Sequence, residues 1–464
     1  MFVGRETELN KLNAMYQSNQ FEFAVLYGRR RVGKTTLINE FCKDKKTIFF
    51  VATESTGKEN LAQFSKCVLK SITGSEGDFS FSSYEDLFQY IDSICKKERL
   101  ILAVDEYPYL AESHKAISSL LQVHIDHMWK DSKLFLILCG SSMSFMENQV
   151  LGYKSPIYGR RTAQMKIHPF SYFDSRRMLN HFTSEEQAVL FGVTGGIPEY
   201  LSRIRSNLSL DENLIQLFFE PSGRLYEEPS NLLKQELKEP ATYHSVLRAV
   251  AQGASKLNEI STKVGIETSA ASAFLNSLIS LGLVKKEVPV TEPQTSRKTI
   301  YLLEDQMFRF WYRFVAPNTS NITWGLGRQV YETMVRPQLN SYMGLVFEDI
   351  CRQCFYQPQF LKTLSFFPQK TGRWWGNNPK ERKQEEIDIL AFDEENLLLG
   401  ECKWNESLVP LTVLQQMEER GALFVKRHKY YILFAKNGVT DSALQYIKAK
   451  QWFRIITFEE INQI

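Results

Sequence analysis

Three short apolar runs stand out in the first third of the chain, at residues 21–27, 100–104 and 133–140. None of them alternates apolar with polar positions, and amphipathic stretches separate them. Unbroken runs of this kind predict strands of a parallel sheet that is buried on both faces, with helices between the strands. The first part of the chain is therefore expected to be an α/β domain.

The first run leads directly into a glycine-rich loop and a helical stretch. Residues 28–35 read GRRRVGKT, which is the pattern G-x-x-x-x-G-K-T between a strand and a helix. In this pattern backbone N–H groups surround the phosphates, the lysine reaches the β and γ oxygens, and the threonine hydroxyl ligates Mg²⁺. We therefore predict that ATP binds here with Mg²⁺. The expected nucleotide contacts are Gly28, Arg29, Arg30, Arg31, Val32, Gly33, Lys34, Thr35 and Thr36.

The other two runs end in polar side chains. The second is followed by Asp105 and Glu106, and the third by Ser141. Because the carboxyl ends of parallel strands border the ligand crevice, Asp105 is expected to hold Mg²⁺ through water. Glu106 would orient and polarise the attacking water. Ser141 would sense the γ-phosphate, or would serve only the turn.

Two arginines follow these strands, Arg160 and Arg161, in the segment YGRR. A guanidinium group can neutralise the charge that develops in phosphoryl transfer, as an arginine finger does. We name both as catalytic candidates, with an ordinary surface position as the alternative.

From residue 244 to residue 301 the pattern changes to three short helical stretches and two strand-like runs. This order predicts a winged helix-turn-helix. Gly265 would end the second helix, Thr268 would cap the third, and residues 292–298 would form the turn of the wing.

The function of this module stays open. A recognition helix for DNA presents several Arg, Lys, Asn or Gln residues, whereas residues 269–281 offer Asn276 and mostly Ser and Ala. Phosphate contacts could come from the wing instead, and a structural or protein-contact role is the alternative. The wing cations are Lys285, Lys286, Arg297 and Lys298.

A hairpin that carries carboxylates is predicted near the C-terminal end. Residues 386–392 and 397–404 read as strands joined by a DEEN turn. With the turn centred in DEEN, cross-strand partners sum to 789, so Asp388 faces Glu401. Two carboxylates within about 5 Å repel each other unless a cation is present. Mg²⁺ there, with Lys403, would make a water nucleophile for phosphodiester cleavage.

Length and composition limit the number of domains and the cellular compartment but do not indicate a function. A chain of 464 residues is expected to divide into about three or four domains. The formal charge of +3 neither requires nor excludes nucleic acid. The sequence contains no apolar run of about 18 residues and no signal-peptide core, and the seven cysteines fit reduced thiols, so we expect a cytoplasmic protein without a membrane segment.

Together these segments resemble the prokaryotic, largely archaeal-type ATPases of the STAND group of the AAA-like superfamily. The resemblance covers nearly the whole chain and includes FVGRE at residues 2–6, the stretch SPIYGRRTAQMKIHPFSYFD, and GGIPEY at residues 195–200. It implies a helical lid that reports the nucleotide state to attached domains. By this resemblance Val3, Gly4 and Arg5 lie beside the adenine, and Pro198 lies near the nucleotide.

The D-x(12)-E-x-K pattern of Asp388, Glu401 and Lys403 resembles the restriction-endonuclease-like, PD-(D/E)XK fold. The preceding helix of that fold usually contributes a further glutamate, and Glu348 fits its position. Ile387 stands where the family has a proline. The resemblance implies Glu348, Asp388 and Glu401 as metal ligands and Lys403 as a catalytic residue. It also implies that the domain either cleaves nucleic acid or only binds it, because this fold is often kept as a scaffold.

The expected architecture is thus a multidomain α/β protein. Its parts are a P-loop ATPase core (1–167), a helical lid (168–235), a winged helix (236–304), a helical connector (305–340) and a nuclease-like domain of the DUF234 type (341–464). ATP would control the last modules, which act on DNA or other nucleic acid. The rival hypothesis is a regulator without nuclease activity, in which the nucleotide gates contacts with a protein or DNA partner.

Overall fold

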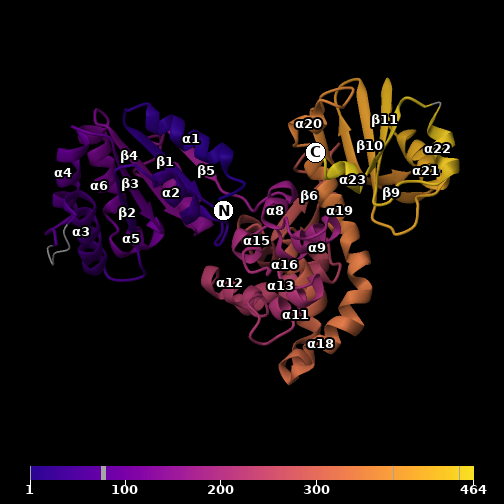
Figure 1. Ribbon diagram of the computed structural model, residues 1–464, viewed down its shortest axis with the longest axis horizontal. Coiled ribbons are helices and arrows are strands. Elements are labelled where there is room, and N and C mark those ends of the chain that lie inside the picture. Colours follow the sequence, from indigo (N-terminus) through magenta and orange to yellow (C-terminus); the bar gives the residue numbers. More distant parts are fainter. Residues whose placement is uncertain (1, 75–79, 380, 449) are drawn as a thin grey trace. The chain divides into compact units, whose positions relative to one another are not determined.

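The fold is known from a computed structural model (Figure 1) that describes residues 2–74, 80–379, 381–448 and 450–464. The chain forms two compact units. The first consists of Met1–Phe170 and Ile197–Glu199, and the second of Ser171–Gly196 and Tyr200–Ile464. Within the described ranges, no helix combines the length and the apolar character needed to span a bilayer.

The first unit is built on a sheet whose described strands run in the order β2-β3-β4-β1-β5, and every neighbouring pair is parallel. All residues of β3 and β4 are buried. The parallel sheet that the apolar runs predict is therefore confirmed. The strands are β1 (Glu22–Tyr27), β2 (Thr47–Val51), β3 (Leu100–Asp105), β4 (Leu134–Gly140) and β5 (Ala163–Lys166).

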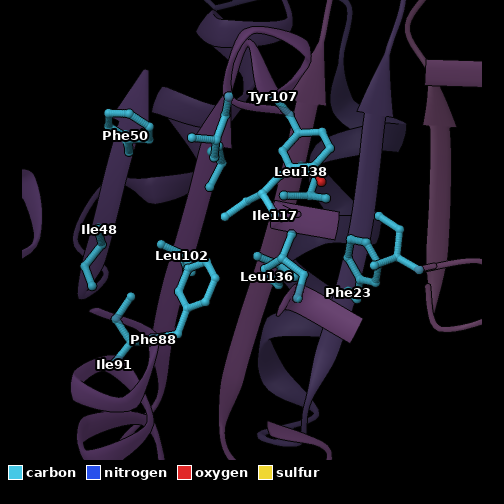
Figure 2. Packing of buried hydrophobic residues seen from close by; sticks show 14 of the residues in the cluster. Phe23, Ile48, Phe50, Phe88, Ile91, Leu102, Tyr107, Ile117, Leu136 and Leu138 are labelled. Carbon is cyan, nitrogen blue, oxygen red and sulfur yellow. The ribbon is translucent and has the colours of Figure 1, made fainter. Parts of the chain in front are cut away.

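Helices cover both faces of this sheet, which explains why its strands are apolar throughout. Phe135 and Leu136 are neighbours on β4, so their side chains point to opposite faces. The ring of Phe135 lies 5.5 Å from that of Phe41 on α2, whereas Leu136 belongs to the cluster in Figure 2 with Phe88 of α4 and Ile117 of α6. The helices of the first unit are α1 (Glu6–Gln17), α2 (Lys34–Cys42), α3 (Gly57–Thr73), α4 (Tyr84–Cys95), α5 (Tyr107–Ser113), α6 (Ile117–His124), η1 (Ile125–Trp129), α7 (Met143–Phe145) and η2 (Met146–Val150).

The second unit begins with a group of helices in which α9 is almost fully buried. The hydroxyl of Tyr342 donates a hydrogen bond to the carbonyl of Gly192 on α9 (2.6 Å), and a Cβ atom on Gly192 would lie 2.8 Å from the side chain of Val346. Both contacts come from α19, so α9 and α19 pack tightly. The helices of this part are α8 (Tyr172–Met178), α9 (Ser184–Thr194), α11 (Leu210–Phe218) and α12 (Glu228–Glu236), while α10 (Pro198–Leu201) begins in the first unit and ends in the second.

Three helices and a two-stranded antiparallel hairpin follow, in the order expected for the middle module. Gly265 ends α14 with φ of 77°, as predicted. Thr268 is not the cap of α15, because Glu267 is the N-cap residue and the Thr268 hydroxyl lies 3.5 Å from that of Ser261. The elements are α13 (Pro240–Ala251), α14 (Leu257–Val264), α15 (Thr268–Ser280), β6 (Val284–Glu287) and β7 (Ile300–Leu303).

Short helical turns then lead into the long helix α19, which carries Cys351 and Cys354 on its buried face. Trp311, the first residue of η3, is buried and donates its indole N–H to the carbonyl of Tyr226 at 2.7 Å. The aromatic side chains of this region are therefore part of the core. The elements are α16 (Gln306–Phe310), η3 (Trp311–Val315), η4 (Ala316–Asn318), α17 (Thr319–Asn321), η5 (Ile322–Leu326), α18 (Gly327–Val330), η6 (Tyr331–Val335), η7 (Arg336–Gln338), α19 (Leu339–Cys354) and α20 (Pro358–Leu361).

A mixed sheet forms the C-terminal part, with described strands in the order β12-β11-β10-β9-β8. Pairs β8/β9 and β9/β10 are antiparallel, and pairs β10/β11 and β11/β12 are parallel. The register from Leu397↔Phe392 to Gly400↔Ile389 is the predicted one. The elements are β8 (Lys370–Asn378), β9 (Lys383–Phe392), β10 (Asn396–Lys403), α21 (Leu411–Gly421), β11 (His428–Ala435), α22 (Asp441–Lys448), β12 (Phe453–Thr457) and α23 (Phe458–Ile461).

Candidate nucleotide site

The phosphate loop connects β1 to α2 at the carboxyl edge of the parallel sheet. A Cβ atom on Gly28 would lie 2.3 Å from the carbonyl oxygen of Ile167, so only glycine fits where the chain leaves β1 beside the end of β5. Gly33 has φ of 89° and is the N-cap residue of α2. The loop therefore ends on the amino terminus of a helix, where N–H groups attract phosphate oxygens.

Lys34 is buried under the loop, with 6% of its surface exposed. Its ammonium group donates to the carbonyl of Gly28 at 2.9 Å and to that of Arg29 at 3.0 Å. An ammonium has three donors, so the third can reach a phosphate oxygen. The lysine thus holds the loop and places a positive charge beneath it.

Thr35 and Asp105 meet at the edge of the site. The Thr35 hydroxyl donates to Oδ2 of Asp105 at 2.6 Å. Asp105 is the last residue of β3 and is 2% exposed, while Thr35, like Thr36, lies on the exposed side of the first turn of α2. The two predicted magnesium ligands are therefore adjacent, although they are 70 residues apart in the chain.

Glu106 follows directly and adopts a left-handed conformation with φ of 50°. Its backbone N–H donates to Oδ1 of Asp105 at 2.9 Å. Its Oε2 accepts two hydrogen bonds from Ser141, from the hydroxyl at 2.8 Å and from the backbone N–H at 3.3 Å. A continuous line of hydrogen bonds thus runs from Thr35 to Ser141.

The N-terminal segment is held against the phosphate loop. The Arg5 guanidinium donates to the carbonyl of Val32 at 2.8 Å and to that of His168 at 2.5 Å, and it lies 4.6 Å from the ring centroid of Phe170. Val3 is buried and Gly4 has φ of 69°. Arg5 therefore braces the loop, and contact of these residues with the adenine stays a prediction.

Pro198 also lies beside the loop, 3.8 Å from where a Cβ atom on Gly33 would be. The backbone N–H of the next residue, Glu199, donates to the carbonyl of Arg31 at 3.4 Å. Arg31 has φ of 71°, and Arg30 donates to the hydroxyl of Tyr109 at 3.0 Å. The segment from Ile197 to Glu199 thus belongs to the nucleotide-binding unit.

Arg160 and Arg161 lie at the other end of the sheet. They precede β5, whose first residue, Ala163, pairs with Ala24, whereas the phosphate loop follows Tyr27. Arg160 forms a two-pronged ion pair with Asp126 at 2.7 and 2.6 Å, and these bonds hold the pKa of Asp126 below its ordinary value. Arg160 is thus engaged with Asp126, and a finger role for either arginine stays a prediction.

Asp388 of the C-terminal hairpin lies close to Glu401 and Glu348, at a β-bulge between β8 and β9. The register of β8 against β9 shifts between Gly372 and Trp374, and the Asp388 carboxylate accepts the backbone N–H of Cys402 at 2.9 Å. Burial, and then the charges of Glu401 and Glu348, raise the pKa of Asp388 to about 7.

Two of these carboxylates, Glu401 and Glu348, form ion pairs with cations. Glu401 pairs with Lys403 and with Arg420, each at 2.7 Å, and Glu348 pairs with Arg352 at 3.4 Å. Within the part of the chain that the structure describes, no three His, Cys, Asp or Glu side chains are grouped so as to hold a metal ion. The role of Glu348, Asp388 and Glu401 as metal ligands therefore stays a prediction.

Arg420 is the residue that sequence reasoning missed here. It reaches Glu401 and Glu385 from α21, and nothing in its local sequence distinguishes it from a surface arginine.

Two of the four cations predicted for the wing are neutralised by ion pairs. Lys285 pairs with Glu287 and Lys298 with Glu292, both at 2.6 Å.

Comparison with known proteins assigns two segments of the chain. Residues 2–204 match a family described as an ATPase domain predominantly from Archaea. Residues 311–420 match a family of archaeal and bacterial proteins of unknown function.

Relatives extend the match. An uncharacterized protein of Methanocaldococcus jannaschii is 32% identical over 408 residues, which are 88% of this chain and 88% of that protein. An uncharacterized ATP-binding protein of the same organism is 50% identical over 46 residues, 10% of this chain and 78% of that protein. A solved Walker-type ATPase of Pyrococcus abyssi is 18% identical with a TM-score of 0.52, covering 67% of this chain and 96% of its own, and shares the fold.

Proposed function

Since the chain belongs, with that Methanocaldococcus jannaschii relative, to the family whose ATPase domain is found predominantly in Archaea, we propose that it binds ATP with Mg²⁺ and hydrolyses it. The observation that carries the proposal is the line of hydrogen bonds that joins Thr35, Asp105 and Glu106 beside the phosphate loop. In this proposal the line brings together two magnesium ligands, Thr35 and Asp105, and Glu106 as the residue that polarises water.

The side chains fit Mg²⁺ bound with a triphosphate. Mg²⁺ takes oxygen ligands, commonly from one or two protein groups, the phosphates and several waters. The Thr35 hydroxyl and the Asp105 carboxylate are such oxygens, and no group of three carboxylates is needed. When bound, the ion neutralises the charge that develops on the phosphates.

Hydrolysis needs a water aligned with the γ-phosphorus. Attack forms a bond from the water oxygen to that phosphorus and breaks its bond to the bridging oxygen, which leaves on ADP. Glu106 accepts a hydrogen bond from the water and takes up its proton, while Lys34 stabilises the phosphate charge. Phosphate release from ATP by the full chain tests this activity.

We further propose that the chain works as an ATPase of the STAND group, in which a helical lid passes the nucleotide state to attached domains. Ile197–Glu199 belongs to the nucleotide unit, whereas α9 before it belongs to the second unit. Between them stand Gly195 and Gly196, with φ of 63° and 67°. Two glycines in the left-handed region can form a hinge, and Gly192, just before them on α9, is packed against α19.

Hydrogen–deuterium exchange tests this coupling. We expect exchange of residues 184–201 to differ between ATP and ADP in a Glu106→Gln chain, which keeps ATP intact, and the difference to shrink when Pro198 is also replaced by glycine. Equal exchange with both nucleotides contradicts the coupling and leaves hydrolysis untouched.

The second unit offers a candidate target for this control. We propose that this target is a winged helix and a nuclease-like domain that act on DNA or RNA. The support is Asp388, which lies at a β-bulge with Glu401 and Lys403 close to it. Bulges redirect side chains next to active sites. The ion pairs of Glu401 support the alternative, a module that binds nucleic acid or protein without cleavage.

A further inference from the structure

Ser141 stands at the end of β4, where it is 2% exposed. Its hydroxyl and its backbone N–H both donate to the same oxygen of Glu106, Oε2, at 2.8 and 3.3 Å. A residue that senses phosphate has to point its hydroxyl at the nucleotide. This serine points both of its donors at the carboxylate that is to polarise water.

The backbone beside Ser141 and the backbone at Glu106 both have conformations that allow this contact. A Cβ atom on Gly140 would lie 2.6 Å from Sδ of Met146 and 2.8 Å from the ring of Pro108, so glycine lets the end of β4 approach the first turn of α5. Glu106 stands just before that turn, with φ of 50° and its N–H bonded to Asp105. A strained conformation at a site persists where its surroundings fix it.

We propose that Ser141 is a positioning residue for Glu106 and not a sensor of the γ-phosphate. Two donors on Oε2 fix the carboxylate in one rotation, so that Oε1 accepts the hydrogen bond from the attacking water. A base that is oriented by a third group is a general arrangement in catalysis. This inference rests on the proposed ATP hydrolysis and names the residue that prepares Glu106 for it.

Steady-state kinetics separates the two roles. Ser141→Ala is expected to lower kcat by about 10–100-fold, the usual cost of a misplaced catalytic group, while KM and the Kd of ATP change by less than about twofold. Ser141→Thr keeps the hydroxyl and is expected to restore most of the rate. Ser144→Ala, an exposed serine three residues further on, is the matched control and should leave kcat unchanged.

A double-mutant cycle decides whether Ser141 acts through Glu106. In a Glu106→Ala chain, with the residual rate followed by release of labelled γ-phosphate, Ser141→Ala should cause no further loss, because residues that act as a unit are not additive. A full additional loss, or an increased Kd for ATP with an unchanged Kd for ADP, would show direct phosphate contact and overturn the inference. If the parent chain releases no phosphate, the proposed function fails first, and the positioning role falls with it.

Discussion

Replacing Lys34 by alanine tests the phosphate site at a buried positive charge. The ammonium makes hydrogen bonds of 2.9 and 3.0 Å to two carbonyls of the loop and has one donor left for the nucleotide. Hydrogen bonds to charged groups contribute about 1.5–3 kcal/mol each. Loss of the nucleotide contact alone therefore weakens ATP binding by about 10–150-fold. Loss of the two loop bonds adds to this, because the loop must then be ordered by the ligand.

Isothermal titration calorimetry with ATP and Mg²⁺ measures the change. The matched control is Lys43→Ala, which removes an exposed lysine paired with Glu40 just beyond the same helix, α2. That exposed pair contributes less than about 1 kcal/mol, so the control should bind ATP like the parent. Thermal melting shows whether both variants are folded. An unchanged Kd in a folded Lys34→Ala chain refutes the reasoning.

The remaining predictions concern the loop, the core of the second unit and the hairpin. Gly28→Ala should reduce ATP affinity and lower the free energy of unfolding by about 1–3 kcal/mol, because its Cβ would lie 2.3 Å from the Ile167 carbonyl oxygen. The control is Gly344→Ala, whose Cβ would have no atom within 4 Å and which should cause neither loss. Equal melting temperatures and ATP affinities of the two variants contradict the prediction. Burial would raise the pKa of Asp349, yet Arg309 and Arg352 hold it below its ordinary value. Asp349→Asn should therefore lower the free energy of unfolding by about 3–5 kcal/mol near neutral pH. Because the stability that comes from a lowered carboxyl pKa is lost as the pH falls through that pKa, the difference between parent and variant in urea denaturation should become smaller below about pH 4. A difference that does not change with pH speaks against the ion pairs. For the hairpin, plasmid, single-stranded DNA and RNA with Mg²⁺ or Mn²⁺ should be cleaved by the parent and by neither Asp388→Ala nor Lys403→Ala; cleavage that persists in both, or never appears, removes catalysis there.

The sequence predicted the phosphate loop because its determinants are contiguous. Gly28, Lys34 and Thr35 lie within eight residues, and the strand before them shows its burial by its own apolar residues. The register of the hairpin could be predicted for the same reason, because a short turn fixes which residues of β9 and β10 face each other.

Two contacts between distant segments could not be predicted. The bond of Ser141 to Glu106 depends on Gly140 letting two elements approach, and the ion pair of Arg420 with Glu401 depends on how α21 lies over the C-terminal sheet. Neither has a signal in the local pattern. For the hairpin, the sequence predicted Lys403 beside the carboxylates, and tertiary structure added Arg420 as a second cation on Glu401.

Phosphate release from ATP by the parent chain and by Glu106→Gln tests the central claim most directly. The parent should hydrolyse ATP with Mg²⁺, and the variant should lose about 100-fold or more of that rate, the scale of a general base or water-orienting group, while its ATP affinity stays within about threefold. Undiminished hydrolysis by Glu106→Gln would contradict the account, because the line of hydrogen bonds from Thr35 to Ser141 would then have no part in the reaction.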